Sequence, residues 1–484
     1  MECGVRHIVL RVYNSLTRKI EEFAPLRGNR VKMYVCGPTV YDYAHIGHAR
    51  TYVSYDVMAR YLRNAGYSLF YLMNITDVDD KIIQRAAERG VHPLELAKEF
   101  ERYFMEDLRD LRIESVNLFA RASEHIDEII DLIKGLLEKG FAYETSTGVY
   151  FDTEAFGPYG ELSGREPEEL SVHRIEPDPT KRRPQDFALW KLRPETELGW
   201  DSPWGYGRPG WHIEDTAIIM TYFGPQLDVH GGAIELIFPH HEAERAQAEA
   251  ASGVAPFSRY WIHTGLLTVE GEKMSKSLGN IISIREVLRR YSAEELRYFY
   301  ASSHYRSPVE FSWENLEAAS RALDGIESVA QEFRSREVSS EELDDRGRGL
   351  LEHLRTGKSR FISALEDDFN TPLALSVLHD SLRFTARYLE TNDSVPEEAR
   401  AEGEAFFALV NSVLGVFSGG LEPSSQLLDE VLSLILNVRE RLRSEKRYEL
   451  ADAIRSALDS LGIRVEDTAG GARWRSASRR VVRR

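Results

Sequence analysis

Hydrophobic and polar positions near the amino terminus predict a strand, a helix and a second strand in succession. Residues 32–36 form a short apolar run with a β-type composition, and Gly37 with the proline after it breaks the run. From about 45 to 64, hydrophobic residues recur with a helical period on one broad face. Gly66 ends that helix, and residues 67–75 are predicted to form another strand. This order is typical of half of a nucleotide-binding fold with a parallel sheet.

The remaining chain divides into segments with different patterns. An apparent insertion holds an amphipathic helix over 124–139 and a strand over 148–152, after which short β-like runs and glycine-rich turns extend from 199 to 260. Residues 314–414 are helical in pattern throughout, and the Gly-, Pro- and Ser-rich stretch 418–425 is typical of a linker. We therefore expect an α/β protein: a doubly wound, Rossmann-type parallel-sheet catalytic domain with an insertion, then an α-helical bundle and a small C-terminal domain. The expected boundaries are 1–110 and 201–260 for the two halves of the catalytic domain, 111–200 for the insertion, 261–313 for a lysine-loop segment, 314–417 for the bundle and 427–484 for the last domain.

Composition and charge narrow the classes of function. The 484 residues are enough for several domains, no apolar run has the length of a membrane span, and no secretory leader is visible. Cys3 and Cys36 are the only two cysteines, which does not suggest a disulfide framework and favours the cytoplasm. With 61 basic and 78 acidic residues the net charge is −17, so a nucleic-acid partner would need a local basic patch.

Two short motifs carry candidate phosphate chemistry. The first, Ala44-His45-Ile46-Gly47-His48, begins the first predicted helix, where free backbone N–H groups and the helix dipole favour anions such as polyphosphates. The second, residues 272–277, places Lys273 and Lys276 in a segment that could form a mobile loop. Cations aimed at phosphate oxygens stabilise the charge that develops when pyrophosphate leaves. Taken singly, the motifs could also be a pair of surface histidines and a solvated basic turn.

A second group of residues could bind a metal. Cys36 ends the first predicted strand, and the stretch Trp211-His212-Ile213-Glu214-Asp215 follows a glycine-containing turn at 207–210. His240 and Glu244 lie four positions apart behind a proline, so a helix there would present imidazole and carboxylate on one face. Spacing alone is weak evidence, because a His–Glu pair on a helix is usually a solvated contact and a lone cysteine is usually a core residue.

The histidine and lysine motifs together, in this order, resemble the signature pair of the class I aminoacyl-tRNA synthetases. Further stretches are similar to the cysteinyl-tRNA synthetase family, and they cover nearly the whole chain: 34–42, 74–81, 207–214, 238–242, 367–372 and 466–475. The resemblance implies a cysteine–tRNA ligase that acts as a monomer on ATP with Mg²⁺, L-cysteine and tRNA-Cys. Such an enzyme forms cysteinyl-adenylate and then transfers the cysteinyl group to the 3′-terminal adenosine of the tRNA.

The resemblance also implies roles for individual residues. The catalytic residues would be His45, His48, Lys273 and Lys276, of which Lys276 is the stronger candidate, and ATP would contact Gly37, Thr39, His45, Gly47, His48 and Lys276. The cysteine pocket would be lined by Cys36, Thr76, Trp211 and Glu235. The last domain would read the anticodon through Arg473, Trp474 and Arg475, because a cation beside a stacking aromatic ring suits unstacked bases.

The chain departs from the family pattern in its pocket. The family holds one zinc ion with two Cys, one His and one Glu, and these positions correspond to Cys36, Asp215, His240 and Glu244 here. The carboxylate keeps the ligand anionic, and zinc binds carboxylate oxygen at about 2.0–2.2 Å and thiolate sulfur at about 2.3 Å, so a zinc site is still expected. Zinc would favour cysteine over serine, because serine offers no comparable soft ligand. Glu235 also replaces a usual Asp, and Ala233 a usual Gly, which leaves an altered substrate or a lost metal open.

Two other functions stay open on the sequence. A related cysteine ligase that acts on a small amine would share the activation domain, but it would have little use for the residues after the linker. A non-catalytic, tRNA-binding paralogue would not need the two histidines and two lysines of the motifs.

Overall fold

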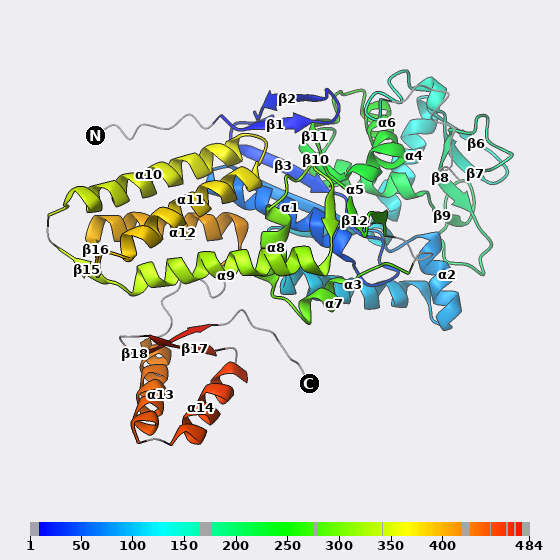
Figure 1. Ribbon diagram of the computed structural model, residues 1–484. Coiled ribbons are helices and arrows are strands. Elements are labelled where there is room, and N and C mark those ends of the chain that lie inside the picture. Colours follow the sequence, from blue (N-terminus) through cyan, green and yellow to red (C-terminus); the bar gives the residue numbers. More distant parts are fainter. Residues whose placement is uncertain are drawn as a thin grey trace.

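The computed structural model describes residues 9–164, 177–274, 279–340, 342–417, 426–445, 447–460, 463–468 and 471–476. At its centre lies a five-stranded, wholly parallel sheet in the order β11-β10-β3-β4-β5 (Figure 1). Its strands are β3 (Arg30–Val35), β4 (Ser68–Ile75), β5 (Leu118–Arg121), β10 (Leu227–Ala233) and β11 (Ser258–Thr264). The predicted doubly wound fold is therefore confirmed, and the first strand, helix and second strand lie within two residues of the predicted bounds.

The chain runs outward from the middle of this sheet in two directions. From β3 it passes through α1 (Ile46–Asn64) to β4, and through α2 (Asp80–Arg89) and α3 (Pro93–Asp110) to β5. On the other side β10 leads through α6 (Glu242–Ser252) to β11. The strand order thus reverses between β3 and β10, whose backbones meet where Cys36 N donates to Gly231 O at 3.0 Å. Open α/β sheets bind their ligands at such a point, at the carboxyl ends of the strands.

An antiparallel sheet of four strands forms most of the predicted insertion. It consists of β6 (Ala142–Glu144), β7 (Gly148–Phe151), β8 (Phe187–Leu192) and β9 (Gly207–Pro209). It packs on α4 (Ile126–Glu138) and α5 (Trp211–Phe223) through a core of its own that includes Ile133, Trp190 and Ile213. The structure shifts both expected edges of the insertion, because β5 belongs to the central sheet and β9 pairs with β8. Short strands carry no pattern that shows which sheet they join.

The prediction of β-like runs throughout 199–260 is wrong for the stretch that forms α5. Nine of the thirteen residues of α5 are buried, so this helix has no polar face from which a helical period could be recognised. Trp211 and Asp215 therefore project from a helix. Before α6, the short helical turns η4 (Ile234–Leu236) and η5 (Ile237–His241) carry Glu235 and His240.

The segment after β11 connects the catalytic domain to the helical bundle. It holds a small sheet of β12 (Leu267–Val269), β13 (Glu272–Lys273) and β14 (Val309–Phe311). Between β13 and β14 the chain forms α7 (Ile284–Leu288) and α8 (Ala293–Ala301). The bundle consists of α9 (Trp313–Ser335), α10 (Asp345–Glu366), α11 (Thr371–Leu389) and α12 (Glu397–Leu414), with a short parallel pair β15 (Glu337–Ser339) and β16 (Ser394–Pro396) that the helical pattern did not predict. One hydrophobic core runs through both parts. The buried ion pair between Asp56 and Arg297, at 2.7 Å, joins α1 to α8 within it.

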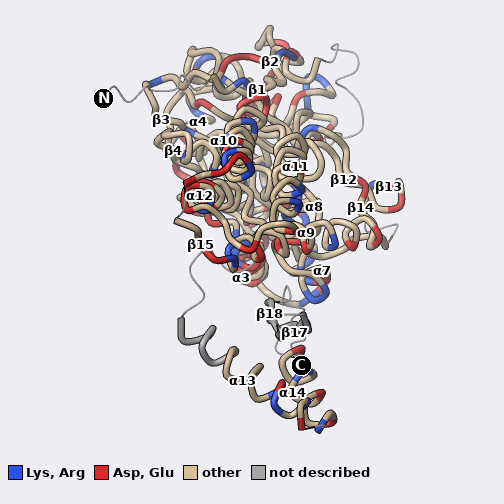
Figure 2. The backbone as a smooth tube through the Cα atoms, turned by 60° about the vertical axis from the view of Figure 1, so that its left-hand side comes forward, with Lys and Arg blue, Asp and Glu red and all other residues tan. Residues whose placement is uncertain are grey.

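Smaller elements complete the structure. A hairpin of β1 (Arg11–Asn14) and β2 (Lys19–Glu22) lies beside β11. The short turn η1 (Ala122–Glu124) precedes α4, and η2 (Thr153–Ala155) lies between β7 and β8. The last domain has α13 (Gln426–Ser444), α14 (Tyr448–Ser460) and a hairpin of β17 (Ile463–Thr468) and β18 (Gly471–Ser476), packed on its own small core. Figures 1 and 2 show it apart from the catalytic body, on the side of α7 where basic residues gather. In the described part of the chain, no helix combines the length and apolarity that a membrane crossing requires.

Candidate active site and metal centre

The first motif forms the amino-terminal cap of α1. His45 is the N-cap residue, and its Nδ1 accepts a hydrogen bond from Gly47 N at 3.1 Å. His48 Nδ1 accepts in turn from His45 N at 3.2 Å, and the two rings stack with centroids 3.9 Å apart. Because both Nδ1 atoms accept, the neutral form of each ring carries its proton on Nε2. The sequence thus builds two N–H donors at a helix start.

Burial keeps these histidines neutral. It lowers the pKa of His45 to about 4, and it lowers the pKa of His48 well below its usual value, with a smaller contribution from His45. Glu235 raises the pKa of His45 slightly, which places this carboxylate near the motif. At neutral pH both rings therefore act as hydrogen-bond donors rather than as cations.

The pH dependence of stability tests this assignment. The pKa of His45 in the folded chain, about 4, lies below the ordinary 6.5, so the unfolded chain binds the proton first as the pH falls. The stability that neutral His45 contributes is thus complete above pH 6.5 and is lost between about 6.5 and 4, at about 1.4 kcal/mol for each unit of pKa shift. His45→Asn keeps a capping side chain but should reduce the fall in melting temperature across this range. His92→Asn, at the exposed N-cap of α3, is the matched control. An identical fall in wild type and His45→Asn would contradict the assignment.

The lysine segment lies against the same end of α1. Ile46 N donates to Ile282 O at 3.0 Å, and Ile284 N donates to Ala44 O at 3.1 Å. Gly47 also lies close to this segment, since a Cβ there would lie 3.0 Å from both the His45 ring and Met274 Cε and would require these neighbours to shift. Half a chain apart in sequence, the two motifs are thus neighbours in space. Lys276 lies outside the described residues.

Lys273 and Glu235, which the sequence assigned to ATP chemistry and to the cysteine pocket, form an ion pair with each other. Both side chains are partly exposed, at 59% for Lys273 and 32% for Glu235. The phosphate-binding and amino-acid-binding candidates are therefore adjacent parts of one site.

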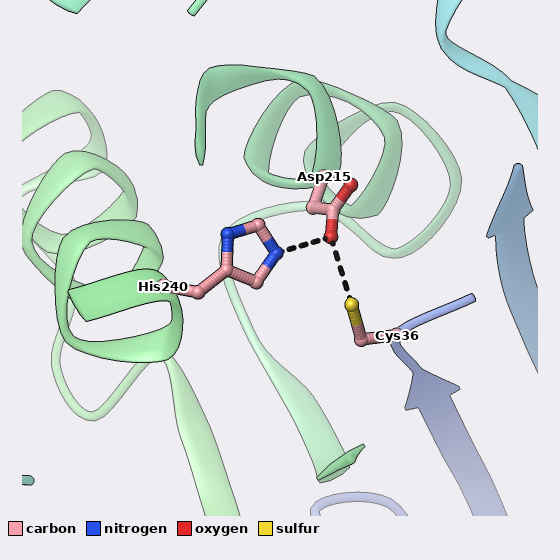
Figure 3. Close-up of side chains that lie close together, drawn as sticks. All are labelled: Cys36, Asp215 and His240. Atoms are coloured by element: carbon pink, nitrogen blue, oxygen red, sulfur yellow. Dashed lines mark hydrogen bonds and ion pairs between the residues drawn. The ribbon is translucent and has the colours of Figure 1, made fainter. Parts of the chain in front are cut away.

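Three of the four predicted metal ligands, Cys36, Asp215 and His240, form one group whose ligand atoms lie within 4.8 Å of one another. Glu244 adjoins this group through His240 and also forms a second group with His230 and His241. Asp215 Oδ2 lies 3.4 Å from Cys36 Sγ and 2.9 Å from His240 Nε2 (Figure 3). His240 Nε2 also lies 3.1 Å from Glu244 Oε1, although His240 belongs to η5 and Glu244 to α6. Cys36 is 6% exposed, and the other three residues are fully buried.

The chemistry of this cluster fits a divalent cation. Burial, with contributions from Asp215 and Glu244, raises the pKa of the Cys36 thiol well above its usual value, and burial with Asp215 does the same for the Glu244 carboxyl. Three acidic groups buried together are costly unless a cation compensates them. Zinc bonds of about 2.0–2.3 Å in a tetrahedron place neighbouring ligand atoms roughly 3.3–3.7 Å apart. The separations within the chain of contacts from Cys36 through Asp215 and His240 to Glu244 are 3.4, 2.9 and 3.1 Å, so the compact group of Cys36, Asp215 and His240 approaches this spacing, with Glu244 adjoining it. One sulfur, one nitrogen and two oxygens are donors that zinc accepts.

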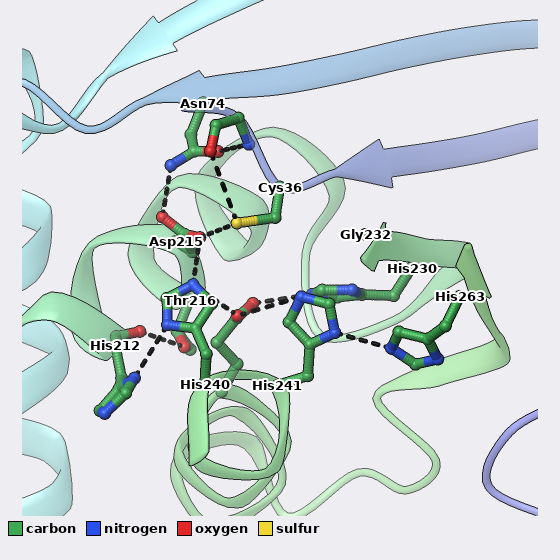
Figure 4. A network of polar contacts seen from close by, with 12 residues as sticks. Cys36, Asn74, His212, Asp215, Thr216, His230, Gly232, His240, His241 and His263 are labelled. Atoms are coloured by element: carbon green, nitrogen blue, oxygen red, sulfur yellow. Dashed lines mark hydrogen bonds and ion pairs between the residues drawn. The ribbon is translucent and has the colours of Figure 1, made fainter. Parts of the chain in front are cut away.

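Sequence reasoning missed the histidines that surround the cluster (Figure 4). His212 Nδ1 lies 2.8 Å from His240 Nδ1, and His230 Nε2 lies 2.7 Å from Glu244 Oε2. His241 Nδ1 lies 2.8 Å from His263 Nε2. Such outer partners orient metal ligands. His212 and His241 had one signal in the sequence, since they follow Trp211 and His240 directly. His230 and His263 had no such signal, because they lie on β10 and β11 and reach the cluster only in the folded chain.

Trp211, Thr76 and Gly37 adjoin the cluster, whereas the tRNA candidates belong to the last domain. Trp211 is 37% exposed and stacks on the His240 ring, with centroids 4.1 Å apart. Thr76 is buried and pairs in a β-bridge with Thr39. A Cβ on Gly37 would lie 1.8 Å from Asn74 O, so only glycine fits there. The backbone of Arg473, Trp474 and Arg475 forms β18, paired with β17 and distant in sequence from this centre.

Two protein-family models and several known cysteine–tRNA ligases match this chain. A family described as "tRNA synthetases class I (C) catalytic domain" matches residues 22–321, and a DALR domain matches residues 360–418. The cysteine–tRNA ligase of Thermococcus onnurineus is 45% identical over 479 residues, which cover 97% of this chain and 100% of the relative. That of Pyrococcus furiosus is 46% identical over 477 residues, with 96% and 99% covered.

A solved structure shares the fold at much lower identity. Mycobacterium tuberculosis methionyl-tRNA synthetase, in complex with methionyl-adenylate, superimposes with a TM-score of 0.64 and 17% identity. The match covers 80% of this chain and 92% of the other, and it supports the class I fold alone. With a family match over residues 22–321 and relatives at about 45% identity along nearly the whole chain, this protein belongs to the cysteine–tRNA ligase family of class I tRNA synthetases.

Proposed function

We propose that this chain joins L-cysteine to tRNA-Cys in two steps and selects cysteine at the cluster of Cys36, Asp215, His240 and Glu244. The observation that carries the proposal is the position of this buried cluster beside the capped histidines and the lysine segment. A site for a thiol and a site for polyphosphate are thereby joined where the strand order reverses between β3 and β10.

In the first step, a cysteine carboxylate oxygen bonds to the α-phosphorus of ATP while the bond to pyrophosphate breaks. Negative charge grows on the phosphate oxygens, and His45 and His48 donate to them through Nε2–H. Lys273 and Lys276 contribute cationic charge, and Mg²⁺ accompanies ATP. Gly37, Thr39 and Gly47 lie where the nucleotide must approach the backbone closely. In the second step, a hydroxyl oxygen of the terminal adenosine attacks the carbonyl carbon, and AMP leaves.

The four ligands would hold zinc, which supplies a soft Lewis acid for the substrate sulfur as its thiolate. The substrate side chain would enter past Trp211, whose indole covers the His240 ring. Thr76 would line the pocket, and Glu235 would accept the substrate ammonium group, a role compatible with its present ion pair to the Lys273 ammonium. Serine presents a hydroxyl in place of the thiol and would gain little from this site.

The tRNA would lie along the helical bundle and reach the last domain. The separately packed domain after the linker is the element that an amine ligase would not need. Arg473, Trp474 and Arg475 would contact anticodon bases. We also propose that the enzyme works in the cytoplasm as a monomer.

Truncation after Ser418 tests the division of labour. Activation of cysteine should stay nearly intact, because the cluster, the histidine cap and the two hydrophobic cores on which they rest all precede this residue. Charging of tRNA-Cys should fall strongly, because the anticodon contacts are lost. Both activities are measured on one preparation, as pyrophosphate exchange and as cysteine attached to tRNA. Unchanged charging would show that the last domain does not read the anticodon.

Transfer of labelled cysteine tests the function itself. We expect the full chain to charge tRNA-Cys and to leave small amines unmodified. Cysteine joined to a small amine without tRNA would favour the amine ligase. Binding of tRNA without adenylate formation would favour the non-catalytic paralogue.

A further inference from the structure

We propose that Asn74 is a positioning residue that fixes Asp215 so that a single carboxylate oxygen faces the ligand cluster. The inference rests on the proposed metal centre and adds to it a requirement created by the carboxylate at position 215.

Asn74 lies near the end of β4 and is fully buried. Its Oδ1 accepts from Gly37 N at 2.5 Å, next to Cys36, and its Nδ2 donates to Asp215 Oδ1 at 2.7 Å (Figure 4). The same Nδ2 also donates to Thr76 Oγ1 at 3.1 Å. The amide therefore connects the strand that carries Cys36 to the helix that carries Asp215.

The orientation of this amide is set by the backbone. A backbone N–H can only donate, so the group that faces Gly37 N must be the Asn74 oxygen. The NH₂ group must then face Asp215 and Thr76. The usual ambiguity between amide oxygen and nitrogen does not arise here. The Asn74 NH₂ group is consequently a donor of fixed direction, and a carboxylate oxygen of Asp215 accepts its hydrogen bond.

This hydrogen bond divides the two oxygens of Asp215 between two tasks. Oδ1 is held by Asn74, and Oδ2 is the atom close to Cys36 Sγ and His240 Nε2. The terminal torsion of an aspartate is broad, so an unrestrained carboxylate could turn and offer a metal both oxygens or neither. A thiolate has one donor atom and would not depend on such a restraint. The need for Asn74 should thus be specific to the aspartate.

The test measures zinc affinity of the full chain by competition with a chelator. Asn74→Ala should weaken zinc binding by about 10–100-fold, the typical effect of losing an outer partner of a metal ligand. In the Asp215→Cys background, the same substitution should change zinc affinity by less than about threefold, well under that range. Asn14→Ala, which removes another buried asparagine that bonds Glu21 and the Arg259 backbone, should leave zinc affinity unchanged.

Equal losses in the two backgrounds would overturn the proposal, because Asn74 would then act through Gly37 and the backbone. No loss in the aspartate background would overturn it as well. A high-resolution crystal structure of the zinc-loaded wild type is a second test that does not depend on a variant folding. Asp215 Oδ1 bonded to Asn74 and Oδ2 bonded to zinc would support the proposal. Both Asp215 oxygens bonded to zinc would refute it. Zinc content of the wild type separates the two levels, since a chain that binds no zinc loses the metal centre itself, whereas one that binds zinc but ignores Asn74 loses only this inference.

Discussion

Replacement of Lys276 by alanine should lower the rate of cysteinyl-adenylate formation by about 10²–10³-fold, the cost typical of losing one donor to the transition state. The reason is the charge that appears on the phosphate oxygens as pyrophosphate leaves. His45 and His48 are neutral, so they contribute hydrogen bonds and no net charge. Besides the Mg²⁺ that accompanies ATP, the cationic charge is expected from Lys273 and Lys276, which precede the backbone at 282–284 that pairs with Ala44 and Ile46 at the start of α1.

Cysteine binding should change little in this variant, because the ligand cluster lies behind the phosphate site. Pyrophosphate exchange measures the first effect and the cysteine KM measures the second. Lys134→Ala is the matched control, since this lysine pairs with Asp131 on the exposed face of α4. Exchange within about threefold of the wild-type rate, far short of the expected loss, would remove Lys276 from the mechanism.

Asp215→Ala should produce the second large effect. It removes one of three acidic groups in a buried cluster and takes one hydrogen-bond partner from each of Asn74 and His240. Zinc affinity should fall by more than the roughly 10–100-fold that loss of an outer partner costs, and cysteine activation should fall with it. Preference for cysteine over serine should decrease as well, because that preference depends on the bound metal.

Asp215→Cys is the informative counterpart. It preserves an anionic ligand and makes the site softer, so zinc binding and activity should both be retained. Zinc content, chelator competition and the ratio of exchange rates with cysteine and serine provide the measurements. If Asp215→Ala bound zinc as tightly as the wild type, Asp215 would not be a ligand, although the enzyme class would stand.

Local features of the chain could be predicted from its sequence. The helix that begins at His45 has strong periodicity and a cap, and β3 and β4 are apolar runs between breakers, so their positions followed from pattern alone. The insertion boundaries did not follow, because β5 and β9 are three or four residues long and join different sheets.

The metal cluster shows the limit more clearly. Only the pair His240 and Glu244 had a spacing that suggested a shared face, and Cys36 and Asp215 were placed with them by resemblance. The roles of Asn74 and His230 could not be predicted, because their partners lie on other elements: Asn74 on β4 bonds Asp215 on α5, and His230 on β10 bonds Glu244 on α6. The contact between Lys273 and Glu235 had no sequence signal either, since 38 positions separate them.

The central claim is that this chain activates cysteine at a metal site completed by a carboxylate. Amino-acid-dependent ATP–pyrophosphate exchange, run with each of the twenty amino acids on the zinc-loaded chain, tests it most directly. We expect exchange with cysteine and none above background with serine or the other amino acids, and we expect a chelator to abolish the cysteine signal. Exchange with serine comparable to that with cysteine, or no exchange with any amino acid, would contradict the account.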